Sequence, residues 1–301
     1  MERREHLYII DNSGNEDCIP GQVNHCRYTV CPTSKPLGFA EANNFALRNL
    51  EAPVDYICFL NQDTLCRPGW LERCVETMDQ DESIGAVTPV LYSFGWQQFN
   101  PNFMACAAEN RELIADLSAQ SARRDFYSVS EIPAAAMVIR SSVLRQTGPF
   151  DSIFGSYYED FDLCRRVRAA GYQVGVCGMS EVAHYDSVTE ENLADVRTRR
   201  RHQLIMRNRA ILKIRNSGDQ RFGTFLRCAG LDLPRQLIRS LLRRPGRKAI
   251  RSVLGAWTSL LRMTPRLLRK DVDEKIWAAE VSDFLLHFPD SARAVPTGRQ
   301  G

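Results

Sequence analysis

A continuous apolar run, Tyr56-Ile57-Cys58-Phe59-Leu60, gives way at once to the polar residues Asn61-Gln62-Asp63-Thr64. Five consecutive apolar residues are typical of a strand that a parallel sheet buries on both faces. Helical patterns flank the run, over residues 38–50 before it and over 71–78 after Pro68-Gly69-Trp70. This alternation predicts an α/β fold: a mixed, mostly parallel sheet with flanking helices and right-handed crossovers.

The same alternation continues along the first two thirds of the chain. We expect strands over residues 7–10, 28–31, 86–91, 134–139 and 174–177, and a short helix over 141–146. Residues 95–130 are less regular and predict a mobile or ligand-facing insertion. From about residue 192 the pattern is helical, with breaks at Asn216-Ser217-Gly218, at Pro245-Gly246 and near Pro265.

Charge is divided unevenly along the chain. Between Arg197 and Lys270 there are 21 lysines and arginines against Asp219 and Asp232, so this stretch carries a charge of +19. The whole chain has a net charge of +3, which leaves −16 for the remainder. Its 301 residues suit one globular domain with an appendage, or two domains. The basic stretch predicts a surface for an anionic lipid, a nucleic acid or a phosphorylated ligand.

Ten cysteines are present and none belongs to a C-x-x-C pair, which argues against a zinc ribbon. The opening residues, Met1-Glu2-Arg3-Arg4-Glu5-His6, lack the apolar core of a secretory signal. No stretch approaches the roughly 18 apolar residues of a membrane-spanning helix. These features predict a cytoplasmic protein with reduced thiols, several of them buried.

Three carboxylates lie close together in the segment Tyr158-Glu159-Asp160-Phe161-Asp162, where a loop is expected to become a helix. Leu163, Val167 and Ala170 follow at helical spacing, and Gly171 is a suitable helix stop. The helix dipole keeps acidic residues of a first turn ionised. The segment is therefore either an ordinary helix start or a corner at which Asp160 takes a proton from a substrate hydroxyl.

Two more acids, Asp11 and Asp63, each follow an apolar strand. In open α/β sheets, ligands bind at the carboxyl ends of the strands, so both acids fall where a ligand site is expected. Each alone is equally well explained as a helix cap or an Asx-turn. A diphosphate ligand would need Mg²⁺ or Mn²⁺, for which Asp63 is the better candidate. His184 would join such a site only if its strand end returns to the same face; otherwise it is an ordinary surface or core histidine.

From about residue 7 to 215 the chain resembles the bacterial family 2 glycosyltransferases, inverting enzymes of the GT-A fold, in their rhamnosyltransferase-like branch. The resemblance lies in short motifs that keep a shared order and spacing. The matching segments are Ile10-Asp11-Asn12-Ser13, Gly38-Phe39-Ala40-Glu41-Ala42-Asn43-Asn44, Phe59-Leu60-Asn61-Gln62-Asp63, Pro68-Gly69-Trp70, Met137-Val138-Ile139-Arg140, Gly148-Pro149-Phe150-Asp151, Tyr158-Glu159-Asp160-Phe161-Asp162-Leu163, Arg166, Gly171-Tyr172, His184 and Arg207-Asn208-Arg209.

The resemblance implies roles for individual residues. Asp160, with Glu159 beside it, would be the general base that deprotonates an acceptor hydroxyl for direct attack on the donor sugar. Asp63 would bind the metal ion under the donor diphosphate, with His184 near it. The implied nucleotide-sugar-binding residues are Asp11, Asn12, Asn43, Asn61 and Asp63.

Four features depart from the family pattern. Asn61 stands where the first acid of the D-x-D element is expected, and Pro36 stands where an asparagine is usual. Ala134-Ala135-Ala136 replaces a Gly-rich stretch, which would narrow the acceptor side. The family ordinarily has a strand and a helix before the Ile-Asp-Asn strand, whereas six residues precede Leu7. We therefore expect an N-terminally truncated nucleotide-binding half, arising from a late start codon or a true truncation.

The basic C-terminal half places apolar residues among arginines at helical spacing. These are Leu237, Leu241, Leu242, Ile250, Val253, Leu254, Trp257, Leu260 and Leu261. An amphipathic helix packed on the catalytic domain explains the pattern about as well as a helix over 230–270 lying in an anionic membrane interface. Aromatic residues are too sparse to favour a nucleic-acid surface.

We expect a glycosyltransferase domain over 1–215, a basic amphipathic helical region over 216–289 and a disordered tail over 290–301. The expected activity is metal-dependent, inverting transfer of rhamnose or a similar sugar from a nucleotide-sugar to a cell-surface glycan or lipid-linked acceptor. The enzyme would act peripherally at the inner face of the cytoplasmic membrane. The alternatives are a catalytically impaired, truncated relative that binds glycans or partner proteins, and a basic protein that adheres to membranes or nucleic acid.

Overall fold

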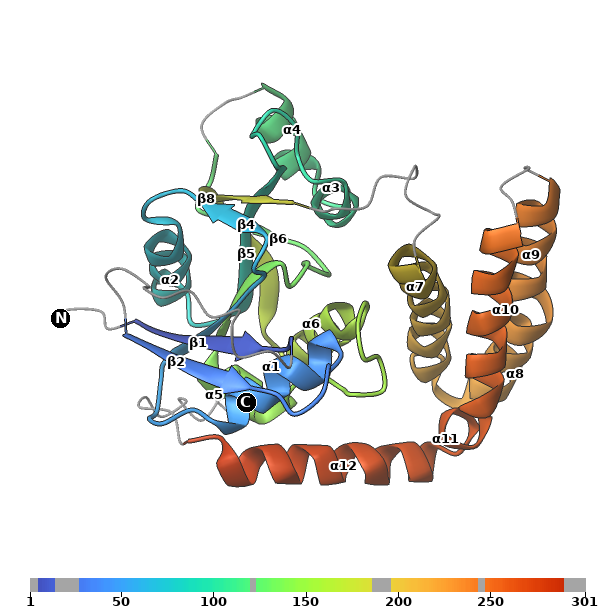
Figure 1. The fold of residues 1–301 in the computed structure, drawn as a ribbon. Coiled ribbons are helices and arrows are strands. Elements are labelled where there is room, and N and C mark those ends of the chain that lie inside the picture. The colour runs from blue at the N-terminus through green and yellow to red at the C-terminus, as the bar shows by residue number, and fades with distance from the viewer. Residues whose placement is uncertain (1–4, 14–26, 120–122, 186–195, 243–246, 290–301) are drawn as a thin grey trace, which may run out of the picture. The chain divides into compact units, whose positions relative to one another are not determined.

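The computed structural model describes residues 5–13, 27–119, 123–185, 196–242 and 247–289 (Figure 1). The chain divides into two compact units. The first combines Met1–Gly155, Asp160–Asp186 and Val281–Gly301, and the second combines Ser156–Glu159 with Ser187–Glu280. No helix in the described part of the chain is both long enough and apolar enough to cross a bilayer. The expected tail over 290–301 lies outside the described residues.

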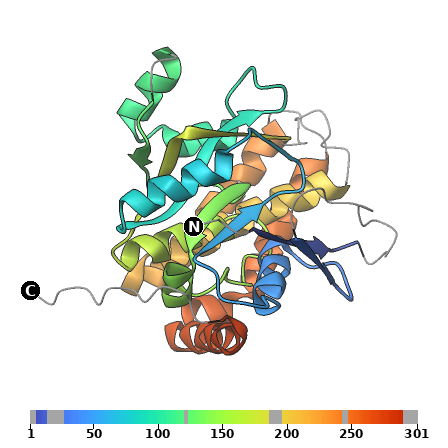
Figure 2. The same cartoon turned by 90° about the vertical axis from the view of Figure 1, so that its left-hand side faces the viewer.

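The first unit begins with a two-stranded parallel sheet of β1 (His6–Asp11) and β2 (Arg27–Pro32). Helix α1 (Phe39–Arg48) contacts β1 and buries Ala40, Ala46 and Leu47 (Figure 2). Gly38 precedes α1 because a Cβ atom there would lie 2.7 Å from the carbonyl oxygen of Gly155. That carbonyl accepts a hydrogen bond from the amide of Ala40, so the start of α1 is held against the Gly155 turn.

A second, six-stranded sheet carries the core of this unit. Its strands are β3 (Tyr56–Leu60), β7 (Ala136–Arg140), β5 (Ile84–Ser93), β8 (Gln173–His184) and β4 (Thr64–Cys66) in that spatial order, with β6 (Phe126–Ser128) also on β8. Strands β5 and β8 pair in parallel, whereas β7 runs antiparallel to both β3 and β5. The predicted α/β class, a mixed sheet with flanking helices, is confirmed.

The expectation that Tyr56–Leu60 is buried on both faces is wrong. β3 lies at one end of the sheet order and pairs with β7, so that Ile57 and Phe59 are buried while Leu60 is exposed. The strand buried on both faces is β5, whose first eight residues are all buried between β7 and β8. An apolar run alone does not distinguish an edge strand, half covered by helices and loops, from a central one.

Residues 95–130 contain regular structure that the sequence analysis missed. Helices α3 (Pro101–Ala107) and α4 (Arg111–Ala119) are each preceded by an asparagine. The Asn100 side chain accepts hydrogen bonds from two amides of α3, and the Asn110 side chain accepts one from Leu113 in α4. Such caps satisfy amides that a helix cannot pair internally, which explains why both short helices begin where they do.

Helices on the sheet complete the first unit. They are α2 (Trp70–Gln80), α5 (Ser141–Thr147) and α6 (Glu159–Ala169), whose first residue is grouped with the second unit. The Phe150 ring packs on those of Phe39 and Phe59. The buried Asn44 side chain accepts a hydrogen bond from the backbone amide of Phe150 and donates one to its carbonyl. This cluster joins α1, β3 and the turn that leads into α6.

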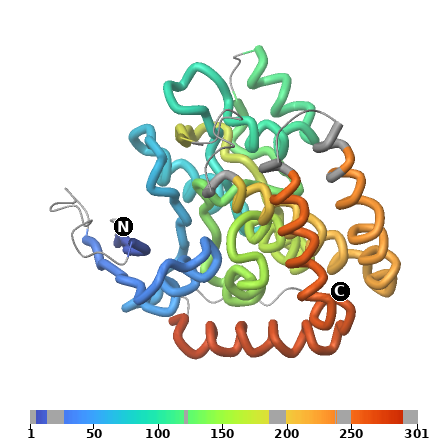
Figure 3. Tube along the Cα trace, turned by 45° about the vertical axis from the view of Figure 1, so that its right-hand side comes forward, coloured from blue at the N-terminus to red at the C-terminus, as the bar shows by residue number. Residues whose placement is uncertain are grey.

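The second unit is helical throughout its described residues from 196 on. Its elements are α7 (Val196–Arg215), a 3₁₀ turn (Gly218–Gln220), α8 (Arg221–Arg227), a π turn (Cys228–Asp232), α9 (Leu233–Leu242), α10 (Arg247–Arg262), α11 (Thr264–Leu268) and α12 (Lys270–His287), whose last residues belong to the first unit. α10 packs along α7 (Figure 3), where the Ser252 hydroxyl donates to the carbonyl of Arg199, and it buries Val253, Ala256 and Leu260. The predicted break at 216–218 is confirmed, since α7 ends at Arg215, whereas the one at Pro245-Gly246 falls outside the described residues.

Candidate active site

Two hydrogen bonds hold the polar turn after β3. The amide of Asn61 donates to the carbonyl of Ala135 at 2.9 Å, and the Thr64 hydroxyl donates to the carbonyl of Asn61 at 2.7 Å. Strand β4 then starts at Thr64 and pairs with β8 so that Thr64 lies opposite His184. This register is what returns the end of β8 to the face that carries Asp63.

Asn61, Asp63 and His184 meet around one nitrogen. The Nε2 atom of His184 lies 3.2 Å from the Asp63 carboxylate and 3.2 Å from the Asn61 side-chain amide nitrogen. In a neutral imidazole this nitrogen either donates or accepts, so it cannot pair with both groups at once. Rotating the Asn61 amide by half a turn would bring its oxygen beside this nitrogen. An amide oxygen, a carboxylate oxygen and an imidazole nitrogen would then be grouped, which is a donor set suited to a divalent cation.

The donor set is small. In the part of the chain that the structure describes, no three His, Cys, Asp or Glu side chains are grouped as a metal cage. Mg²⁺ and Mn²⁺ at phosphate sites commonly take one or two protein carboxylates and draw further oxygens from phosphate and water. The residues therefore fit a cation shared with a diphosphate, and they do not fit a structural site closed by protein alone.

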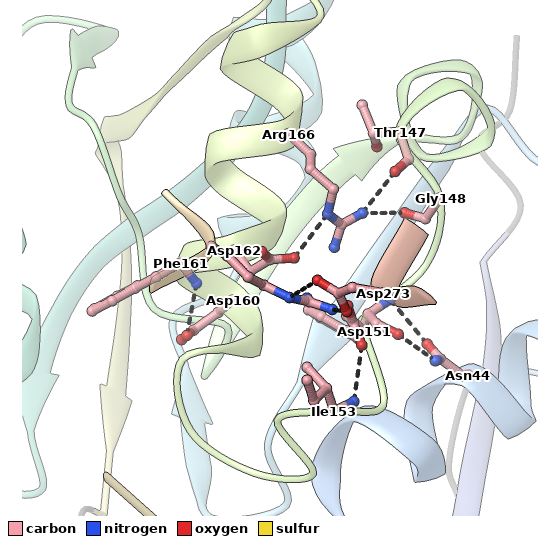
Figure 4. Close-up of polar contacts among 12 residues, drawn as sticks. Asn44, Thr147, Gly148, Asp151, Ile153, Asp160, Phe161, Asp162, Arg166 and Asp273 are labelled. Atoms are coloured by element: carbon pink, nitrogen blue, oxygen red, sulfur yellow. Dashed lines mark hydrogen bonds and ion pairs between the residues drawn. The ribbon is translucent and has the colours of Figure 1, made fainter. Parts of the chain in front are cut away.

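Asp160 lies in the first turn of α6 with its carboxylate held by the backbone (Figure 4). It accepts hydrogen bonds from the amide of Ala134 at 3.1 Å and from the amide of Phe161 at 2.9 Å. Burial raises the pKa of Asp160 to about 6, and the two amide donors oppose that rise. A carboxylate with such a pKa is mostly ionised at neutral pH yet basic enough to accept a proton.

A short stretch of backbone connects Asp160 to the metal-ligand candidates. Ala134 donates to Asp160, and the next residue, Ala135, accepts the hydrogen bond from Asn61. The predicted base and the predicted cation ligands are thus held to opposite ends of one dipeptide. The sequence predicted the residues, and the structure adds the Ala134-Ala135 backbone that fixes their spacing.

The other two acids of the corner differ from Asp160. The Asp162 carboxylate pairs with Arg166 at 2.9 Å, and Arg166 also donates to the carbonyls of Thr147 and Gly148 (Figure 4). Asp162 therefore serves to anchor α6. Glu159 heads the helix and is 4% exposed; its catalytic contribution stays a prediction.

The predicted nucleotide-binding residues at β1 are engaged in local structure. Asp11 accepts hydrogen bonds from the hydroxyl and amide of Ser13, which lower its pKa, as an Asx-turn does. The Asn12 side chain accepts from the amide of Leu37 at 2.8 Å and donates to its carbonyl at 3.0 Å. Asn43 donates to the carbonyl of Phe39, one turn earlier in α1. Within the described ranges, no hydrogen bond or ion pair joins Asp11 to Asp63, Asp160 or His184.

Two groups near Asp160 escaped the sequence analysis. Burial, and then the charge of Asp160, raise the pKa of the Cys106 thiol in α3 to about 12. The same two causes raise the pKa of the Glu131 carboxyl. Cys106 and Glu131 come near Asp160 through the fold of the chain, and no sequence motif marks either residue.

The mixed α/β sheet carries an acid–histidine pair at its strand ends and a half-buried carboxylate at a helix start. The chain is a member of glycosyl transferase family group 2, whose model matches residues 56–270. That range includes Asn61, Asp63, Asp160 and His184.

The chain is similar to the pre-mycofactocin glycosyltransferase of Mycobacterium tuberculosis, in both strain CDC 1551 / Oshkosh and strain H37Rv. It is 33% identical to each over 161 residues, which cover 53% of this chain and 33% of the relative. The chain thus spans about a third of the length of the curated relatives it matches. Among solved structures, the mannosyltransferase PcManGT from Pyrobaculum calidifontis, in complex with GDP-Man and Mn²⁺, shares the fold at TM-score 0.50 and 14% identity, over 94% of this chain and 76% of that one.

Proposed function

We propose that this protein is an inverting glycosyltransferase that uses a nucleotide-sugar donor and Asp160 as its general base. The observation that carries the proposal is the continuous connection from Asp160 through Ala134 and Ala135 to Asn61, His184 and Asp63. Membership of a glycosyltransferase family and the related fold of a mannosyltransferase solved with GDP-Man support it.

In the proposed reaction the ionised Asp160 accepts the proton of an acceptor hydroxyl as that oxygen attacks the anomeric carbon. Attack from the side opposite the leaving diphosphate inverts the anomeric configuration without a covalent enzyme intermediate. The backbone amides of Ala134 and Phe161 hold the carboxylate in place, so little reorganisation is needed when the proton moves. Glu159 precedes this base at the buried start of α6.

Asp63, His184 and Asn61 would hold a Mg²⁺ or Mn²⁺ ion, which supplies positive charge to the leaving diphosphate when it is bound. The Asn61 and Asp63 side chains both contact Nε2 of His184, and that grouping is the structural argument for the ion. Asp11, Asn12 and Asn43 complete the proposed donor site. Because the Asn12 amide already bonds Leu37, its contribution is to shape the loop after β2.

The proposed donor sugar is rhamnose or a similar hexose, and the proposed acceptor is a cell-surface glycan or a lipid-linked glycan at the inner face of the cytoplasmic membrane. Helix α10 supports a membrane-bound acceptor. Its buried face packs on α7, whereas Leu254, Trp257 and Leu261 form an exposed apolar stripe at a spacing of three and four residues. The exposed Arg251 and Arg262 lie beyond the two ends of this stripe. Apolar side chains with flanking arginines suit an anionic bilayer surface.

The test is release of nucleotide from dTDP-rhamnose, GDP-mannose and UDP-glucose by the purified chain in the presence of Mn²⁺. We expect turnover of at least one donor, loss of that turnover in Asp160→Asn, and its dependence on the divalent ion. Donor binding without any turnover, unchanged in Asp160→Asn, would instead identify the protein as a glycan- or partner-binding relative that has lost catalysis.

A further inference from the structure

Two exposed aromatic rings lie immediately beyond the site. Ser93, the last residue of β5, pairs in register with His184, the last residue of β8. The next residues along the two strands, Phe94 and Tyr185, therefore leave the sheet together. Their ring centroids are 5.4 Å apart, with the ring planes at 86°. Phe94 is 60% exposed and Tyr185 is 54% exposed.

Hydrogen bonds within the loop hold the backbone around Phe94. The amide of Ser93 donates to the carbonyl of Gln98 at 2.7 Å, and the amide of Trp96 donates to the carbonyl of Ser93 at 3.1 Å. Gly95 and Trp96 both adopt positive φ, at 95° and 63°, which is uncommon for a tryptophan and persists only where the surroundings enforce it.

The enforcing contacts come from the Trp96 ring. The Arg67 guanidinium lies over it, 4.1 Å from the ring centroid, and the Tyr92 ring packs on it at 5.4 Å. Glu181 ties these partners together, because its carboxylate accepts a hydrogen bond from Tyr92 and pairs with Arg67. The loop thus keeps Trp96 inward and Phe94 outward.

The aromatic pair is continuous with the proposed cation site. Tyr185 follows His184 directly, and its amide donates to the carbonyl of Asp63 at 2.8 Å. The backbone that carries one ring is thereby fixed to the residue proposed to hold the ion. A ligand resting on the two rings would lie next to the proposed diphosphate position.

We propose that Phe94 and Tyr185 form an aromatic platform for the ring of a neutral hexose, the acceptor sugar of the reaction; this inference rests on the proposed function. Because the two ring planes are nearly perpendicular, the pyranose stacks on the face of one ring and contacts the edge of the other. The faces of aromatic rings carry partial negative charge and attract the weakly positive C–H groups on one face of a pyranose. The sugar hydroxyls, which project around the pyranose edge, remain free to bond polar groups or water. Two exposed aromatic rings beside a polar site match the mixed character of a sugar, which is apolar on one face and polar at its rim.

The experiment is saturation-transfer difference NMR on the full chain with four probes: methyl α-L-rhamnoside, methyl α-D-mannoside, methyl β-D-glucoside and methyl β-D-galactoside. We expect saturation of the C–H protons on one pyranose face for at least one probe. Phe94→Ala and Tyr185→Ala should each weaken the apparent affinity by about three- to tenfold, the effect of losing one aromatic contact. Phe94→Leu, which keeps an apolar side chain of similar bulk, should weaken it as well, whereas Phe94→Trp should restore it.

Phe222→Ala is the matched control, because Phe222 is 62% exposed and lies in α8 of the other unit. It should leave saturation unchanged. The platform is refuted if no probe is saturated by the wild-type chain, or if Phe94→Ala and Phe94→Leu both behave as Phe222→Ala does. It is also refuted if Phe94→Ala weakens the saturation of UMP or GMP rather than that of a glycoside, since the rings would then bind the nucleobase of the donor.

Nucleotide release, measured in parallel, separates this inference from the proposed function. Sugar binding that depends on Phe94 in a chain that turns over none of the donors would leave the platform standing and would refute the enzyme. Donor turnover, together with glycoside binding that does not depend on Phe94 and Tyr185, would support the enzyme and refute the platform.

Discussion

The carboxylate of Asp160 accepts a 3.1 Å hydrogen bond from the backbone amide of Ala134, in the turn before β7 whose next residue, Ala135, bonds Asn61. A base held by main-chain donors keeps its position when neighbouring side chains change. It also keeps a fixed relation to Asp63 and His184, which are anchored to the same backbone through Asn61. The proposed catalytic and ion-binding roles can therefore be separated by mutation.

Asp160→Asn should abolish transfer while leaving donor binding nearly intact. Asparagine has almost the same shape and retains an oxygen that can accept from the Ala134 amide, but it cannot take up a proton. We expect kcat to fall by roughly a hundredfold to ten-thousandfold, the usual contribution of a general base. The donor dissociation constant, measured by titration calorimetry, should change little.

Asp162→Asn is the control for this substitution, since Asp162 lies in the same turn and pairs with Arg166. It should lower the melting temperature slightly and leave kcat within a fewfold of wild type. Equal losses of kcat in the two variants would mean that the charge of the turn, rather than the Asp160 carboxylate, supports the reaction.

The rate of transfer should fall as the pH drops through about 6. Burial raises the pKa of Asp160 to about 6, so below that pH the carboxyl is protonated and cannot act as a base. Above it the carboxylate is ionised and the rate should be level. The measurement is kcat against pH with a saturating donor. At pH 4.5 the Asp160 carboxyl would be mostly protonated, because that pH lies well below its pKa. A kcat that stays constant down to pH 4.5 would therefore contradict the role of Asp160 as the base.

Much of the candidate site could be predicted because its residues follow signals that are local in sequence. Asp63 and Asp160 each stand at a strand end or helix start, where ligand sites are expected, and both occupy such positions in the structure. What sequence patterns could not supply was the register of β4 on β8, which decides that His184 returns to Asp63. A pairing between residues 64 and 184 depends on the whole intervening fold.

The main errors of prediction have the same cause. The run Tyr56–Leu60 was expected to be buried on both faces, yet its burial was decided by the neighbours of β3 in the sheet. Residues 95–130 were expected to be irregular because α3 and α4 are short, and short helices are stabilised chiefly by caps and packing. The Phe94–Tyr185 contact likewise arises from strand pairing and carries no motif.

Asp63→Ala should weaken donor binding in a way that depends on the metal ion. Removing the carboxylate takes away the one anionic side chain of the Asn61–Asp63–His184 group. We expect Mn²⁺ to tighten donor binding to the wild-type chain by at least about tenfold and to Asp63→Ala hardly at all. Binding of GDP-mannose and dTDP-rhamnose is measured by calorimetry with Mn²⁺ and with EDTA.

The two site variants together form a stricter test. Loss of donor binding in Asp160→Asn, with metal-dependent binding preserved in Asp63→Ala, would reverse the assigned roles. His184→Ala should resemble Asp63→Ala, because its Nε2 atom lies 3.2 Å from the same carboxylate.

The outer face of α10 should bind anionic membranes. Replacing Leu254 and Trp257 together by serine removes two exposed apolar side chains and leaves the face packed on α7 untouched. We expect sedimentation with phosphatidylglycerol-containing vesicles to weaken by at least about tenfold, as the loss of one or two inserted apolar side chains implies. Leu286→Ser, at a highly exposed leucine of α12, is the control. Unchanged vesicle binding in the double variant would refute the interface role of α10.

Asp273→Asn should destabilise the helical unit. The Asp273 side chain is buried and pairs with three arginines, Arg215, Arg221 and Arg266. Burial alone would raise the pKa of Asp273, but the hydrogen bonds and charges of Arg215 and Arg266 lower it overall. The stability that the ionised Asp273 contributes is therefore present at neutral pH and is lost as the pH falls below the range of an ordinary aspartate. We expect the unfolding free energy at pH 7 to fall by about 3–5 kcal/mol, because three cations lose their buried partner.

Asp271→Asn is the control, because Asp271 is an exposed acid two residues before Asp273. It should change the unfolding free energy by less than about 1 kcal/mol. Denaturant titration followed by circular dichroism measures both, and equal effects would show that the buried cluster contributes no more than a surface pair.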